Sequence, residues 1–74
     1  MDEIRFRLNF SPEEYLPFYR GEIRWVVVRA EDGRRIQFPA EHLRPFVTEG
    51  GIKGRFAMRF DRDKKFQGLR RLGG

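Results

Sequence analysis

Two segments of the sequence carry basic side chains at alternate positions, and these residues are the best suited to binding chemistry. The basic residues in segments 3–10 and 52–60 all have odd numbers: Arg5, Arg7, Lys53, Arg55 and Arg59. Guanidinium and ammonium groups bind phosphate oxygens, and arginine can do so with two parallel hydrogen bonds. The pattern predicts contact with the phosphate backbone of RNA or DNA.

The net charge of +5 is concentrated in the C-terminal third of the chain. Residues 1–49 sum to −1 and residues 50–74 sum to +6. Such asymmetry indicates an anionic partner. Four further cations could extend the basic set: Lys64, Lys65, Arg70 and Arg71. Thirteen of the sixteen cations are arginine, which suits phosphate binding but is equally expected from the base composition of a genome.

Residues that could support catalysis are scarce. The chain has one histidine, one serine and one threonine (His42, Ser11 and Thr48) and no cysteine. A nucleophile, a base and an orienting group cannot be assembled from this set in the usual way. The carboxylate pairs at positions 13–14 and 61/63 suit a helix start and a turn. We therefore expect a protein that is not an enzyme and has no metal or cofactor.

The basic segments must be strands for their cations to gather on one surface. Residues 3–10 and 52–60 carry large apolar side chains at even positions, such as Phe6 and Phe56, and cations at odd ones. This alternation of period two is typical of a half-buried strand. If both strands share a sheet, the cations lie on its outer face. A basic outer face is also typical of an antiparallel sheet that is merely solvated, or of a protected edge strand.

A short helix is predicted between the first two strands. Ser11 is a good N-cap, Pro12 fits the first helical position, and Glu14 completes a capping box. Pro17 limits the helix to one or two turns because it lacks the N–H that a longer helix needs. We expect the helix to end near residues 20–21.

A hairpin is predicted in the middle of the chain. Residues 22–31 read as a strand, and residues 25–28 within it are apolar on both faces, which favours a central strand or a tight bend of a rolled sheet. Asp32 and Gly33 predict the turn. A third strand over residues 34–38 ends at Pro39.

Turns and one more strand complete the predicted elements. Residues 40–44 form a helical or 3₁₀ turn before Pro45, with Leu43, Phe46 and Val47 closing the core. Glycines at 50–51 precede the basic strand 52–60, in which Gly54 marks a bulge or a close approach of a bulky neighbour such as Trp25. Residues 61–64 connect to a last strand over 65–72, and residues 73–74 are a frayed tail.

The expected fold is α+β and mainly antiparallel β, in one domain of residues 1–74. Five strands would form a curled sheet or small open barrel with one short helix and one helical turn; the alternative is a ferredoxin-like βαββαβ sheet. The longest apolar run, residues 25–28, is too short to span a membrane. The acidic N-terminus is unlike a secretory signal and cysteine is absent, so a cytoplasmic location is expected.

Several fragments resemble a bacterial family of small proteins catalogued as domain-of-unknown-function family 2835. They are residues 11–21, Asp32-Gly33-Arg34, Phe38-Pro39-Ala40, residues 43–48, and Gly51-Ile52 with Gly54-Arg55-Phe56. The resemblance covers nearly the whole chain. It implies a stand-alone bacterial protein with no established activity, cofactor or catalytic residue.

A second function is open beside nucleic-acid binding. Aromatic residues of the helix and of the turn after residue 40 could form an exposed patch that binds another protein: Tyr15, Phe18, Tyr19 and Phe46. Such an adaptor requires a contiguous exposed apolar surface. Exposed aromatics for base stacking are not evident, so nucleic-acid binding is expected to be weakly sequence-specific.

Overall fold

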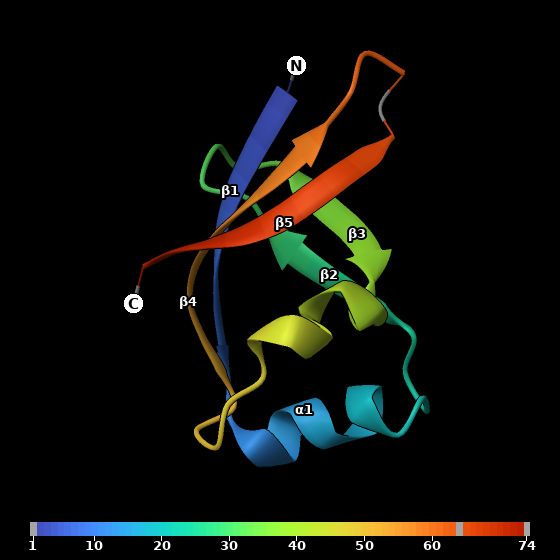
Figure 1. Ribbon diagram of the computed structural model, residues 1–74, viewed down its shortest axis with the longest axis vertical. Coiled ribbons are helices and arrows are strands. Elements are labelled where there is room, and N and C mark those ends of the chain that lie inside the picture. The colour runs from blue at the N-terminus through green and yellow to red at the C-terminus, as the bar shows by residue number, and fades with distance from the viewer. Residues whose placement is uncertain (1, 64, 74) are drawn as a thin grey trace.

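The computed structural model describes residues 2–63 and 65–73 of the chain. The elements follow one another as β1 (Asp2–Phe10), α1 (Pro12–Tyr19), β2 (Trp25–Arg29), β3 (Arg35–Pro39), the 3₁₀ helix η1 (Ala40–Phe46), β4 (Ile52–Phe60) and β5 (Phe66–Gly73) (Figure 1). All strand pairings are antiparallel, so the predicted α+β class with mainly antiparallel strands is confirmed.

The larger sheet has three strands in the order β1-β4-β5. The pairing of β1 with β4 is unbroken, and it sets Phe6 opposite Phe56 and Arg7 opposite Arg55. Even-numbered residues of both strands therefore share one face and odd-numbered residues share the other. Phe6 and Phe56 are fully buried, which confirms the predicted orientation of both strands.

The other two strands form a separate sheet, so the prediction that all five strands form one curled sheet or small open barrel is not confirmed. In the described residues the β2–β3 hairpin is tied to the larger sheet by a backbone hydrogen bond from Glu31 N to Arg5 O, 2.7 Å long. The ferredoxin-like alternative also fails because it needs a single sheet. Val26 is buried, but Trp25 and Val27 are exposed, so β2 is not covered on both faces.

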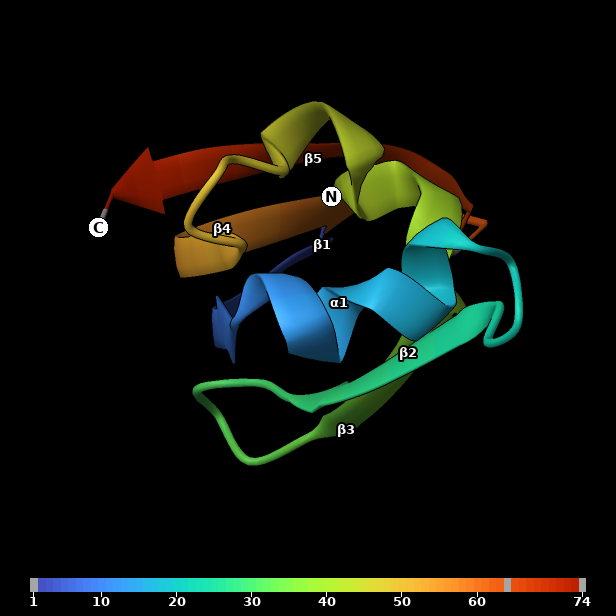
Figure 2. The same cartoon turned by 90° about the horizontal axis from the view of Figure 1, so that it is seen from below.

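The hydrophobic core lies between the two sheets. Phe38 of β3 meets Phe6 of β1 with ring centroids 5.7 Å apart, and Phe6 stacks on Phe56 at 6.0 Å. Leu43 of η1 is fully buried in the same cluster. In Figure 2, α1 lies between the β2–β3 hairpin and strands β4 and β5, and therefore covers one end of the core.

The predicted start of α1 is confirmed. The Glu14 N–H donates to Ser11 Oγ at 3.2 Å, and the Ser11 N–H donates to Glu14 Oε1 at 3.0 Å. These hydrogen bonds lower the pKa of Glu14, because they favour its ionised form. The helix ends after Tyr19 and is followed by Gly21 at φ 79°, as the sequence predicts. None of the helices in the described ranges is long and apolar enough to cross a membrane.

The segment after β3 is longer than predicted. The 3₁₀ helix runs to Phe46 and includes Pro45, whereas the sequence predicted a single turn over residues 40–44. Leu43 fills the core as expected, and Phe46 packs against it, but Val47 is exposed. At Gly51 the φ angle is +95°, and a Cβ there would overlap the carbonyl oxygen of Phe10, so this turn requires glycine.

Gly54 is a point of close approach rather than a bulge in the β1–β4 pair. It lies opposite Leu8 in the unbroken register. Its φ angle is +143°, and a Cβ would lie 2.5 Å from Gly73 O and 2.8 Å from Arg71 Nε. The close neighbour is thus β5 and not Trp25. Gly73 belongs to β5, so the predicted frayed tail is wrong at this residue, and Gly74 lies outside the described residues.

Candidate functional site

Six basic side chains share the outer face of the larger sheet, which we call the cationic face. Its members are Arg5, Arg7, Lys53, Arg55, Arg59 and Arg70. The first five are the odd-numbered cations of β1 and β4, brought together by the register of this strand pair. Arg70 of β5 lies opposite Ala57 and joins the same face.

The carboxylates of Glu3 and Glu31 partly neutralise the cationic face. Glu3 accepts a hydrogen bond from Arg5 Nε at 3.0 Å and lies 3.6 Å from Arg70 Nη2. Glu31 accepts two hydrogen bonds from Arg55, at 2.6 Å and 2.7 Å. Arg7 and Lys53 are exposed, and no ion pair of either is found within residues 2–63 and 65–73. The described face therefore keeps a positive excess.

Glu31 belongs to the β2–β3 turn but reaches across β1 to Arg55. The backbone hydrogen bond to Arg5 O anchors this turn beside β1. The hydrogen bond from Arg55 is the main cause that lowers the pKa of Glu31, and the charges of Arg7 and Arg5 lower it further. Like charges directly opposite in a sheet repel, so the Glu31 carboxylate relieves the repulsion between Arg7 and Arg55.

Sequence reasoning missed Glu31. Its partner Arg55 is 24 residues away, and neither strand periodicity nor turn chemistry connects the two positions. The available signal was the Asp32-Gly33 turn, which predicted a hairpin end at this residue but not where that end would dock.

The remaining predicted cations do not all join the cationic face. Arg71 lies opposite Phe56, and its Nε would be 2.8 Å from a Cβ placed on Gly54. Because successive residues of a strand alternate between faces, Arg71 lies on the opposite face from Arg70 and is not a member of the cationic face. Lys65 is exposed in the β4–β5 connection. Lys64 lies outside the described residues.

The four aromatic residues predicted to bind a partner protein do not form an exposed patch. Tyr15 is only 3% exposed, while Tyr19 is 59% exposed. Phe18 and Phe46 are half-buried, and Phe46 meets Phe56 edge-on at 5.3 Å. Tyr15, Phe18 and Phe46 turn inward because α1 and η1 use them to close the end of the core, whereas Tyr19 stays exposed.

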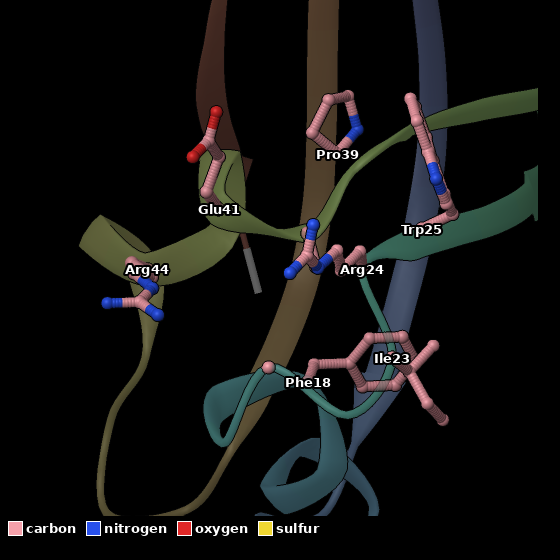
Figure 3. A pocket seen from close by; sticks show the side chains of 9 residues that line it. Phe18, Ile23, Arg24, Trp25, Pro39, Glu41 and Arg44 are labelled. Atoms are coloured by element: carbon pink, nitrogen blue, oxygen red, sulfur yellow. The ribbon is translucent and has the colours of Figure 1, made fainter.

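A cleft of about 410 Å³ opens where the end of α1, the start of β2 and η1 meet. Trp25 stands at this cleft and is exposed, an aromatic available for base stacking that was not evident from the sequence (Figure 3). The lining residues are Phe18, Gly21, Ile23, Arg24, Trp25, Pro39, Ala40, Glu41 and Arg44.

A smaller hollow of about 310 Å³ lies on the cationic face between Glu3, Arg5, Glu31 and Asp32. Among the described residues, no group of three or more histidine, cysteine or acidic side chains is arranged to hold a metal ion.

Comparison with known proteins yields one informative match. No curated protein and no solved structure matches the chain significantly. A family model described as "Protein of unknown function (DUF2835)" matches residues 2–72. Because this match covers nearly the whole 74-residue sequence, the chain belongs to the DUF2835 family.

Proposed function

We propose that this protein is a non-enzymatic module that binds RNA or DNA through the cationic face. The observation that carries the proposal is the unbroken β1–β4 register, which supports the gathering of five cations from two distant segments on one face. The carboxylates of Glu3 and Glu31 pair with members of this face, and Asp32 lies beside it but pairs with Arg34, so the surface retains an attraction for phosphate.

The dimensions of the cationic face suit a nucleic-acid backbone. Alternate residues of a strand are about 6.7 Å apart, and adjacent strands are about 4.8 Å apart. Lys53 and Arg59 therefore lie about 20 Å apart along β4, which is the axial length of about six base pairs. Phosphate contacts carry no sequence information, so we expect binding with little sequence preference.

A titration against salt tests this proposal. A labelled duplex is titrated with the protein between about 50 mM and about 200 mM salt. Neutralising about four phosphates gives a log–log slope of roughly −3 to −4. The double variant that combines Arg7→Glu and Lys53→Glu should bind the duplex at least tenfold more weakly. Its log–log salt slope should be less steep by about 2.

The matched control for this double variant combines Arg29→Glu and Arg35→Glu in one protein. These two exposed arginines face each other on the β2–β3 sheet, so the control changes the net charge equally without touching the cationic face. The proposal fails if the duplex does not bind at low salt, or if both double variants weaken binding equally.

A protein-binding adaptor is the second candidate function. The four aromatic residues predicted to bind a partner protein do not supply the surface of an adaptor. The exposed side chains of Ile23, Trp25 and Val27, on and beside β2, do favour an apolar contact with a partner protein. A pull-down from native extract with and without nuclease separates the candidates. A partner retained after nuclease treatment, and lost on Val27→Asp, supports the adaptor.

A further inference from the structure

We propose that the cleft beside Trp25 binds an unpaired base of a single-stranded nucleic acid, with the adjoining phosphates on Arg24 and Arg44. This inference rests on the proposed function, because it takes nucleic acid as the ligand. It adds a second contact site, which would distinguish single strands from duplexes.

Trp25 and Pro39 form a rigid platform at the mouth of the cleft. They are cross-strand partners at the end of the β2–β3 pair. The Ala40 N–H donates to the Arg24 carbonyl oxygen at 2.8 Å, which fixes the strand end beside them. Trp25 is 54% exposed, so its indole is open to a ligand. Nucleic-acid bases stack on exposed aromatic rings whatever their sequence.

The charges around the cleft favour a phosphate-bearing ligand over an apolar protein segment. Arg24 and Arg44 line the cleft against a single carboxylate, Glu41. All three are exposed, and no ion pair among them is found in the described part of the chain. The Arg44 guanidinium lies 5.7 Å from the centre of the Tyr19 ring, which restricts its orientation. In the view of Figure 3, the Arg24 guanidinium stands between Arg44 and Trp25.

The size and position of the cleft favour an unpaired base. Its volume of about 410 Å³ is in the range of sites for small ligands. A base inside a duplex is stacked on both sides and cannot present its face to Trp25. The cleft lies at the end of the β2–β3 sheet beside α1 and η1, and it shares no lining residue with the cationic face, so the two sites can be tested independently.

Because Trp25 is the only tryptophan, its fluorescence reports directly on stacking. The probes are a short oligothymidylate, a duplex of the same length, and inorganic polyphosphate. The oligothymidylate is expected to quench Trp25 fluorescence to saturation, whereas the duplex and polyphosphate bind without quenching. If the oligothymidylate binds but does not quench Trp25 fluorescence, the inference is overturned.

Variants separate stacking from charge. Trp25→Ala should weaken binding of labelled oligothymidylate by about 5- to 150-fold and leave duplex binding unchanged. Trp25→Phe should keep most of the affinity. Val27→Ala, on the same exposed face but outside the cleft lining, should have no effect. Circular dichroism checks that each variant is folded.

The failures of the two proposals are distinguishable. In one outcome, duplex binding needs Arg7 and Lys53, but single-strand binding is insensitive to Trp25→Ala. That outcome overturns this inference and leaves the proposed function standing. Absence of binding to every nucleic-acid probe at low salt overturns both. Protein capture that depends on Trp25, without quenching by oligothymidylate, also overturns the inference and identifies a protein as the occupant of the cleft.

Discussion

At the scale of single residues, the Glu31 carboxylate holds Arg55 in the way that a phosphate would. Its two hydrogen bonds from Arg55 measure 2.6 Å and 2.7 Å, the bidentate geometry that arginine also uses with phosphate. Arg5 and Arg7 act on the same carboxylate through their charges. A bound backbone would therefore compete with Glu31 for Arg55.

Replacing Glu31→Gln is expected to strengthen nucleic-acid binding. Release of Arg55 adds one cation to the cationic face, so the salt slope should steepen by about 0.9. The affinity should rise about two- to fivefold, the scale of an exposed ion pair. The salt titration described above measures both. Glu49 is an exposed residue of the turn before β4, so Glu49→Gln removes the same charge away from the cationic face. This control should change the salt slope and the affinity less than Glu31→Gln does.

Tyr15 carries a buried hydroxyl for which no hydrogen-bond partner is found among the described residues. Its pKa is raised above 10.0, chiefly by burial. Below pH 10 the phenol is neutral in both the folded and unfolded states, so its contribution to stability is intact. As the pH rises above 10, the unfolded phenol ionises first and stability is lost until the folded pKa is passed.

Replacing Tyr15→Phe is therefore expected to leave the free energy of unfolding unchanged, or to raise it by up to about 1 kcal/mol, because an unsatisfied buried hydroxyl is removed. The variant should also lose less stability than the parent between about pH 8 and about pH 10.5. Urea unfolding at both pH values measures this. Tyr19→Phe, in an exposed ring, should behave like the parent; a drop of 2 kcal/mol in Tyr15→Phe would contradict the argument.

At the scale of elements, the pairing of β4 with β5 decides which cations face outward. Register shifts interrupt this pair between Arg55 and Phe56 and between Arg59 and Phe60. Strand periodicity applies only between such shifts. Arg70 and Arg71 are consecutive residues between the two shifts, so alternation places Arg70 on the cationic face and Arg71 on the side of Phe56.

Gly54→Ala is expected to destabilise the protein by roughly 1–3 kcal/mol, because a Cβ would meet the Gly73 carbonyl and because φ is +143°. The damage should be confined to the end of β5, so amide exchange should accelerate there more than in the β1–β4 pair. Gly68→Ala in β5 is the control, since no atom lies within 4 Å of a Cβ at that position. Its effect should stay within about 0.5 kcal/mol.

At the scale of the whole molecule, the two sheets turn different chemistry outward on opposite sides of one core. The larger sheet presents the cationic face, and the β2–β3 sheet presents Trp25 and Val27. A chain of 74 residues buries a limited fraction of its surface. A protein this small would gain stability by burying its tryptophan in the core. The exposure of Trp25 therefore supports a role for this side chain in binding.

Local rules were sufficient for the parts of the fold that depend on neighbours in sequence. Period-two alternation placed Phe6 and Phe56 in the core, and Ser11 with Glu14 marked the helix start. The position of the β2–β3 turn also followed from two residues, Asp32 and Gly33. These outcomes follow from side-chain alternation, capping hydrogen bonds and turn preferences, which act over a few residues.

Tertiary structure alone decided what these elements meet. The division into two sheets, the burial of Tyr15, the exposure of Trp25 and the contact of Glu31 with Arg55 each depend on segments far apart in the chain. An apolar run such as residues 25–28 has the same periodicity whether one face or both are covered. The sequence by itself therefore determined that cations alternate with core residues in two strands, whereas long-range packing determined which cations share a face and which aromatic ring remains outside.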